Sequence, residues 1–307
     1  MSRSSLSIVR MLAGAAFFAP SAACARNAPE SNDVHAEHAV TPSGGRMTAA
    51  VASDTALPAG ALDVAARIAH SPRHGEWVMI RTGPSDSVKA WVVYPERSTK
   101  APVVLVVHEI FGLSTWVRGV ADQLAADGYI AIAPDLLTGK AAPAPGSDTL
   151  TQAAASAAIR TLGTADVHRQ LAAVGQYGVS LSAAEKRYGI VGFCWGGSTS
   201  FMHAVTSPPG LGAAAVYYGT SPADSLLSRV KVPVIGLYAG DDARVNATVA
   251  PAVEVMRSLG KRYEPHTFAG AGHGFLRQQE GKDGANLAAS RQAWPLTIAF
   301  FRTNLGR

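Results

Sequence analysis

The sequence predicts an α/β protein built on a mostly parallel sheet with helices on both faces. Short apolar segments alternate with amphipathic segments along the chain, which is typical of repeated strand–helix units. Residues 102–108 are nearly all Val and Leu, as expected for a strand that is buried on both faces. Residues 76–81 and 88–94 flank a Gly-Pro-Ser-Asp turn, and this pattern predicts an initial hairpin.

The remaining elements follow from apolar runs and from helical spacing of apolar residues. Strands are expected at 129–133, 190–193, 213–218, 234–238 and 263–268. Helices are expected at 61–69, 114–127, 149–181 in one or two pieces, 198–205, 248–259 and 286–304. Open parallel sheets bind ligands at the carboxyl ends of their strands, so a site is expected at that edge.

The composition limits the classes of partner. The net charge is +5 over 307 residues, and Arg3 and Arg10 of the N-terminal segment supply two of these charges. The remaining excess is too small and too scattered for nucleic-acid binding. No segment after residue 25 is apolar enough to be a transmembrane helix.

The N-terminus predicts an exported protein. Residues 1–25 combine a basic start, an apolar stretch too short to span a bilayer and an Ala-Cys-Ala cleavage pattern, which together indicate a signal peptide cleaved near Ala25. We therefore expect a periplasmic or secreted protein. Lipid anchoring at Cys24 is the alternative, although the usual Leu three residues before the Cys is missing. Residues 26–72 are expected to form a flexible leader with a possible short helix, and residues 73–307 the α/β domain.

Residues 192–197, Gly-Phe-Cys-Trp-Gly-Gly, are the most informative segment for function. They lie between an expected strand and an expected helix, and this arrangement predicts the nucleophile elbow of an α/β-hydrolase, with Cys194 in place of the usual Ser. The helix N-terminus after Cys194 favours a thiolate. The alternative interpretation is a buried structural cysteine. Cys24 is the only other cysteine, so removal of the signal peptide would leave Cys194 unpaired.

The residues that a nucleophile needs follow in the chain order of this fold. An acid comes after the strand ending near residue 239, and His273 comes after the last strand. Asp241 and Asp242 are both candidates for the acid. Asp242 is favoured because the Asp-x-x-Val pattern places the acid at the turn and returns Val245 to the core.

An oxyanion hole requires two backbone N–H groups near the nucleophile. One is expected from Trp195, the residue after the nucleophile. The other is expected from Ile110, in the loop after the strand at 102–108.

These motifs together resemble the dienelactone hydrolase family, whose fold is an eight-stranded α/β-hydrolase. The resemblance covers roughly residues 73–303, nearly the whole chain after the leader. Five segments carry it in the family's order: His-Glu-Ile-Phe-Gly at 108–112, Ala-Pro-Asp-Leu-Leu at 133–137, the elbow at 192–197, Tyr-Tyr-Gly at 217–219 and Gly-His-Gly-Phe at 272–275.

The resemblance implies further roles. Glu109 would contact Cys194 and help to generate the thiolate when substrate binds; the alternative is that Glu109 only braces its loop. Arg277 would bind a substrate carboxylate, or would instead be a surface residue. The family's second arginine is missing after the Asp-Leu motif, and Lys140 is a substitute whose register is off by one.

The sequence therefore predicts a cofactor-free and metal-free hydrolase of a small lactone or carboxylic ester. Phe111, Tyr217 and Trp195 are candidate pocket walls, although aromatic residues there would also suit the core. A general short-chain carboxylesterase and a catalytically silent binding protein on the same fold remain alternatives. The oligomeric state stays open, and a monomer is compatible with the sequence.

Overall fold

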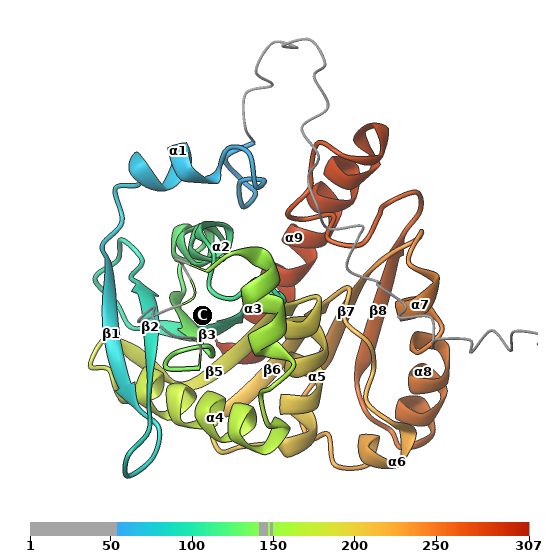
Figure 1. Ribbon diagram of the computed structural model, residues 1–307. Coiled ribbons are helices and arrows are strands. Elements are labelled where there is room, and N and C mark those ends of the chain that lie inside the picture. The colour runs from blue at the N-terminus through green and yellow to red at the C-terminus, as the bar shows by residue number, and fades with distance from the viewer. Residues whose placement is uncertain (1–53, 141–146, 148–149, 307) are drawn as a thin grey trace, which may run out of the picture. The chain divides into compact units, whose positions relative to one another are not determined.

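The computed structural model describes residues 54–140, 147 and 150–306. These residues form an eight-stranded sheet in the order β1-β2-β4-β3-β5-β6-β7-β8 (Figure 1). The first two pairings, β1 with β2 and β2 with β4, are antiparallel, and all the others are parallel. The strands are β1 Gly75–Arg81, β2 Ser87–Val93, β3 Ala101–Val107, β4 Ile130–Asp135, β5 Ala184–Phe193, β6 Leu211–Tyr217, β7 Val234–Ala239 and β8 Tyr263–Phe268. The predicted fold class is confirmed.

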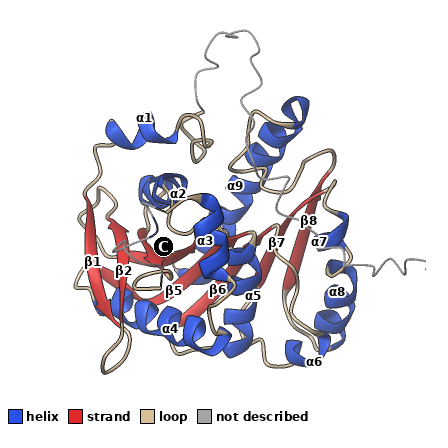
Figure 2. Cartoon of the chain, viewed as in Figure 1, coloured by secondary structure: helices blue, strands red, loops and turns tan. Residues whose placement is uncertain are grey.

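Helices cover both faces of this sheet (Figure 2). They are α1 Val64–Ala69, α2 Thr115–Ala126, α3 Gln152–Ile159, α4 Thr164–Ser180, α5 Trp195–Thr206, α6 Asp224–Leu227, α7 Ala243–Asn246, α8 Val249–Ser258 and α9 Ala285–Leu305. One core cluster joins α2 and α9 to the sheet, and a second joins α4, α5 and α8. Every residue of β3 is buried between them, which explains its unbroken apolar sequence. Full burial of one Val or Leu side chain contributes roughly 1.5–3 kcal/mol.

The differences from the predicted elements are local. The helical stretch at 149–181 forms two helices, since α3 ends at Ile159 and Gly163 caps the start of α4. The helix expected from residue 198 begins at Trp195, because Cys194 is its N-cap. The short helices α6 and α7 were not predicted, since a four-residue helix is too short to show a helical period.

Residues 54–69, which the sequence assigned to the leader, pack against the rest of the protein. Leu57 is buried in the core. The N–H of Ala61 donates to the carbonyl of Arg277 at 2.8 Å, and the Gln279 side chain donates to the carbonyl of Pro58 at 2.8 Å. This segment therefore supports the loop that follows β8, where His273 lies.

The predicted signal peptide, Cys24 and the leader up to residue 53 lie outside the described residues. Among the helices that the structure does describe, none has the length and apolar character needed to cross a membrane.

Candidate active site

Cys194 lies at a sharp turn between β5 and α5. Its backbone has φ 54° and ψ −117°, a left-handed conformation that is uncommon for any residue except glycine. The turn is possible because glycines allow the chain to approach itself closely. A Cβ atom on Gly192 would lie 1.9 Å from the carbonyl oxygen of Gly196. The strand–turn–helix geometry predicted for the elbow is therefore present.

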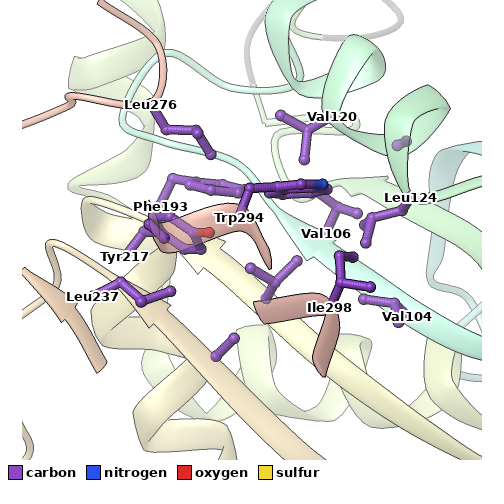
Figure 3. Packing of buried hydrophobic residues seen from close by; sticks show 14 of the residues in the cluster. Val104, Val106, Val120, Leu124, Phe193, Tyr217, Leu237, Leu276, Trp294 and Ile298 are labelled. Carbon is purple, nitrogen blue, oxygen red and sulfur yellow. The ribbon is translucent and has the colours of Figure 1, made fainter. Parts of the chain in front are cut away.

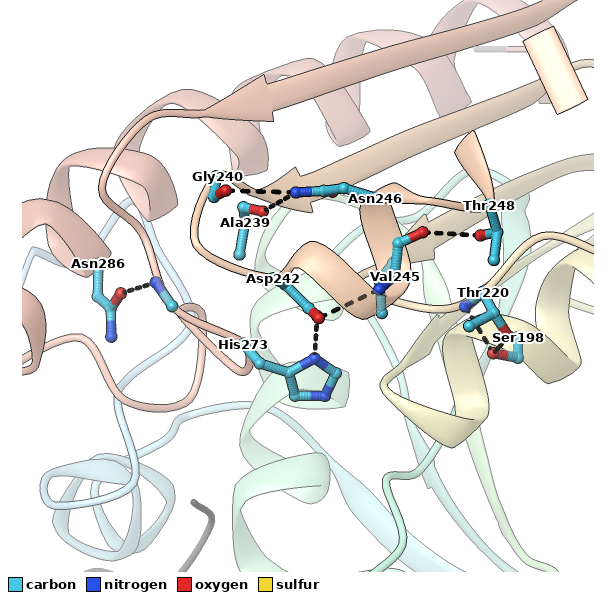
Figure 4. Close-up of polar contacts among 11 residues, drawn as sticks. Ser198, Thr220, Ala239, Gly240, Asp242, Val245, Asn246, Thr248, His273 and Asn286 are labelled. Carbon is cyan, nitrogen blue, oxygen red and sulfur yellow. Dashed lines mark hydrogen bonds and ion pairs between the residues drawn. The ribbon is translucent and has the colours of Figure 1, made fainter. Parts of the chain in front are cut away.

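Asp242 and His273 meet at the same edge of the sheet (Figure 4). The Nδ1 atom of His273 lies 2.5 Å from Oδ2 of Asp242. Asp242 also accepts a hydrogen bond from the N–H of Val245 at 3.2 Å, and Val245 is buried as the Asp-x-x-Val pattern requires. Asp241 instead lies half exposed, 3.3 Å from Nζ of Lys282. Of the two candidate acids, the structure pairs Asp242 with the histidine.

The electrostatic environment favours a protonated His273. Burial alone would lower the pKa of its imidazole, but hydrogen bonds to Asp242 and Cys194, together with their negative charges, raise the pKa to about 9. The pKa of Asp242 is lowered in turn: burial opposes the charged carboxylate, while the bond to His273 more than offsets this.

Asn286, at the start of α9, holds the loop that presents His273. Its Oδ1 atom accepts from the N–H of Gly272 at 2.9 Å (Figure 4), and its Nδ2 atom donates to the carbonyl of Gln278 at 2.7 Å. Asn286 is almost completely buried. The sequence did not indicate this role, since the contacts reach back 14 and 8 residues from a helix terminus.

The two backbone N–H groups predicted for an oxyanion hole, those of Ile110 and Trp195, are without a helix or strand partner. A Cβ atom on Gly196 would lie 2.4 Å from the carbonyl oxygen of His108, so the first turn of α5 abuts the end of β3. Trp195 is the first residue of α5, and its N–H therefore has no acceptor within the helix. The N–H of Ile110 also has no hydrogen-bond acceptor among the described residues.

His108 braces the loop that carries Ile110. Its Nδ1 atom lies 2.8 Å from the carbonyl oxygen of Glu109, and its Nε2 atom accepts from the N–H of Leu136 at 3.3 Å. The imidazole ring stacks on Trp195 with ring centroids 5.5 Å apart. Burial lowers the pKa of His108, which keeps the ring neutral and suits one donated and one accepted bond.

Glu109 and Arg277 form a buried ion pair. Oε2 of Glu109 lies 2.7 Å from Nε of Arg277, and the two side chains are 3% and 6% exposed. The guanidinium also lies over the ring of Phe111, 5.1 Å from its centroid. Nη2 of Arg277 is buried without a hydrogen-bond partner among the described residues. Arg277 is therefore not a surface residue, and it retains an unused donor.

The structure shows the surroundings of two further candidate substrate-binding residues, Tyr217 and Lys140. Tyr217 is buried beside Phe193 and Trp294 (Figure 3), and its hydroxyl lies 2.7 Å from Oγ1 of Thr297. Tyr217 is thus a core residue, and its proposed place in a pocket wall is corrected. Lys140 is exposed in the turn after β4, directly before residues 141–146, which lie outside the described part.

Tyr218, the residue after Tyr217, lies beside His273, where Tyr217 was expected to line the pocket. Its ring centroid lies 5.1 Å from that of His273. Side chains alternate between the two faces of a strand, so a regular continuation of β6 would point residues 217 and 218 to opposite faces. Tyr218 lies beyond the end of β6, and its φ of 38° departs from strand geometry, so this alternation does not apply to it. Sequence patterns do not report such a change, so Tyr218 was missed.

The described residues contain no group of three or more His, Cys, Asp or Glu side chains that could hold a metal ion.

Comparisons with known proteins are consistent with this geometry. Residues 88–305 match the sequence model of the dienelactone hydrolase family. A Salmonella typhi protein, named as an inferred carboxymethylenebutenolidase, is 29% identical over 265 residues, which cover 80% of this chain and 96% of that protein. A crystal structure of a Klebsiella pneumoniae protein, named as an inferred dienelactone hydrolase, is 25% identical with a TM-score of 0.66 and covers 75% of this chain and 98% of that one. Dienelactone hydrolase from Anabaena variabilis shares the fold, with 20% identity, a TM-score of 0.57 and coverage of 77% and 100%.

Proposed function

The chain belongs to the dienelactone hydrolase family and is a hydrolase of lactones or esters, and we propose that it works through Cys194, His273 and Asp242 on a small lactone or carboxylic ester. The contact that carries the proposal is the Asp242–His273 pair, with the imidazole hydrogen-bonded to Cys194 at a strained turn. Nucleophile, base and orienting acid are the three groups that covalent acyl transfer requires.

The reaction follows from these positions. The Cys194 thiolate attacks the carbonyl carbon, and the N–H groups of Ile110 and Trp195 bind the resulting oxyanion. Collapse expels the leaving oxygen, which takes the proton from His273, and leaves a thioester on Cys194. Water then gives a proton to His273 and attacks the thioester, which releases the acid and restores the thiolate. Asp242 holds the imidazole in the required orientation.

The Glu109–Arg277 pair supports a role in substrate-dependent activation. A substrate carboxylate that bound Arg277 would compete with Glu109 for the same guanidinium. Glu109, released from the ion pair, would then be an anion near Cys194 and could take its proton. Until then the pair neutralises both charges, and a neutral Cys194 thiol would resist oxidation.

We further propose that the protein is exported. The signal-peptide pattern at residues 1–25 supports this address, and an enzyme with a single remaining cysteine cannot lose it to an internal disulfide.

The first test is hydrolysis of a dienelactone and of a neutral aryl ester by the protein and its Cys194→Ala variant. We expect turnover that falls by about 10⁴-fold or more in the variant. Turnover of the dienelactone supports carboxylate binding by Arg277, whereas turnover of the neutral ester alone makes the protein a general carboxylesterase. Absence of Cys194-dependent turnover of either compound contradicts the proposal and favours the silent binding protein.

A further inference from the structure

Tyr218 is unusual among the buried residues of the site. Its side chain is fully buried, yet its hydroxyl has no hydrogen-bond partner among the described residues. A buried hydroxyl without a partner is unfavourable, because it has lost its bonds to water. The adjacent Tyr217 shows the usual solution, since its buried hydroxyl bonds to Thr297 at 2.7 Å.

The backbone of Tyr218 adds a second unfavourable feature. Its φ of 38° lies in the left-handed region, which is rare for an aromatic residue. This conformation follows directly after β6, and the N–H of Tyr218 is held there by the carbonyl of Leu237 at 2.9 Å. Strain that the surrounding structure maintains beside a reactive group is evidence for function.

The surroundings of Tyr218 show which way its hydroxyl can act. The ring packs on Phe275 with centroids 5.3 Å apart and on His273 at 5.1 Å. The ionisable groups that act most strongly on the phenol are Glu109, Arg277 and Cys194. Burial raises the pKa of Tyr218 well above its usual value, so the phenol is a neutral hydrogen-bond donor throughout the working pH range.

The proposed reaction leaves one substituent of the attacked carbon for this side of the site. The sulfur of Cys194 forms one bond, the oxyanion points to the N–H groups of Ile110 and Trp195, and the leaving oxygen must face His273. The acyl chain is the remaining substituent, and the Tyr218 hydroxyl is a polar group beside His273 that has no hydrogen-bond partner among the described residues.

We propose that Tyr218 binds substrate by donating a hydrogen bond to an oxygen atom of the acyl chain. This inference rests on the proposed function and adds a substrate class to it. The enzyme then prefers acyl groups that carry an oxygen acceptor close to the carbonyl, such as an alkoxy, keto or carboxylate oxygen, over plain alkyl acyl groups. Such a substrate also satisfies the unpaired hydroxyl of the free enzyme.

A matched pair of esters tests the proposal. 4-Nitrophenyl methoxyacetate and 4-nitrophenyl butyrate have the same leaving group and acyl chains of equal length, and they differ by one ether oxygen in place of a methylene. In Tyr218→Phe we expect kcat/KM for the methoxyacetate to fall roughly 3–10-fold, as for one neutral hydrogen bond. We expect kcat/KM for the butyrate to stay within about twofold.

Tyr217→Phe is the matched control, because it removes a hydroxyl from the adjacent, structural tyrosine. It should lower the melting temperature through loss of the bond to Thr297 and leave the ratio of the two esters unchanged. Tyr218→Phe should keep or raise the melting temperature, because it removes an unsatisfied hydroxyl. That combination, lower selectivity without lower stability, is not expected of a purely structural residue.

The outcomes distinguish a failure of the Tyr218 proposal from a failure of the proposed hydrolase function. An equal fall for both esters, or no fall for either, overturns the role of Tyr218 while the wild-type enzyme still shows Cys194-dependent turnover. Failure of the wild type to hydrolyse either ester through Cys194 overturns the role of Tyr218, and failure with the dienelactone as well overturns the proposed function.

Discussion

Buried histidines in two regions of this protein have pKa values that are shifted in opposite directions. His273 lies at the carboxyl edge of the sheet between Asp242 and Cys194, and its pKa is raised to about 9 although burial opposes this. His168 on α4 and His203 on α5 stack with ring centroids 5.6 Å apart. Burial lowers their pKa values to about 4 and about 3, and His168 lowers that of His203 further.

The difference lies in the partners and not in the depth of burial. Neither His168 nor His203 has a carboxylate partner among the described residues; Nε2 of His203 lies 3.2 Å from the hydroxyl of Tyr188. These rings are therefore neutral packing groups at pH 7. A carboxylate in direct contact stabilises the protonated imidazole, as at His273, and the cation can then donate its proton during the reaction.

Substitution of the catalytic and the packing histidines should give the largest difference in kcat. We expect His273→Gln to lower kcat by about 10⁴-fold or more, because the proton carrier is lost. His203→Gln should leave kcat within about threefold, since His203 lies away from the reacting atoms, and should instead lower stability. Steady-state kinetics below the melting temperature of each variant provide the measurement. A comparable loss of kcat in the two variants would contradict the assignment.

The acid partner of His273 should be the next largest effect. Asp242→Asn should lower kcat by roughly 10²–10⁴-fold, because an amide neither stabilises the imidazolium nor selects the required tautomer. Asp241→Asn is the matched control on the neighbouring residue and should stay within about twofold, because its one ion pair among the described residues is with the half-exposed Lys282. A larger loss in Asp241→Asn than in Asp242→Asn would show that the wrong acid has been chosen.

The neutral pair of His168 and His203 should lower the free energy of unfolding at acidic pH. The folded pKa values of His168 and His203 lie below the unfolded value of about 6.5. The unfolded chain therefore binds more protons, and the free energy of unfolding should fall as pH drops from 6.5 toward 4, by up to about 1.4 kcal/mol per pH unit for each histidine. Urea unfolding at pH 7, 6 and 5 measures the slope, which His168→Gln should reduce. A slope unchanged by that variant would contradict the prediction.

His273 should show the opposite and smaller dependence. Its folded pKa of about 9 lies above the unfolded value, so its contribution to stability is fully present below pH 6.5 and is lost as pH rises toward 9. The difference in unfolding free energy between wild type and His273→Gln should shrink over this range, by at most about 1.4 kcal/mol per pH unit. A difference that grows with pH would mean that His273 is neutral in the folded protein.

Much of the fold and the catalytic order was determined by the sequence alone. A hairpin turn pattern predicted β1 and β2, and apolar runs predicted the other six strands. For β3 the reason is plain, because a strand buried on both faces must be apolar along its whole length. The elbow was predicted from its glycines, since only they permit the close approach seen at Gly192. Asp242 was favoured over Asp241 because Val245 had to return to the core. Each of these inferences depends on residues close together in the chain.

The tertiary structure alone decided how side chains from distant elements meet. The Glu109–Arg277 ion pair joins residues 168 positions apart, and His168 meets His203 only because α4 and α5 pack side by side. The choice between Tyr217 and Tyr218 depends on where β6 ends and on one backbone angle. Sequence periodicity carries no information on such contacts, because it reports which face of an element is buried and not which partner buries it.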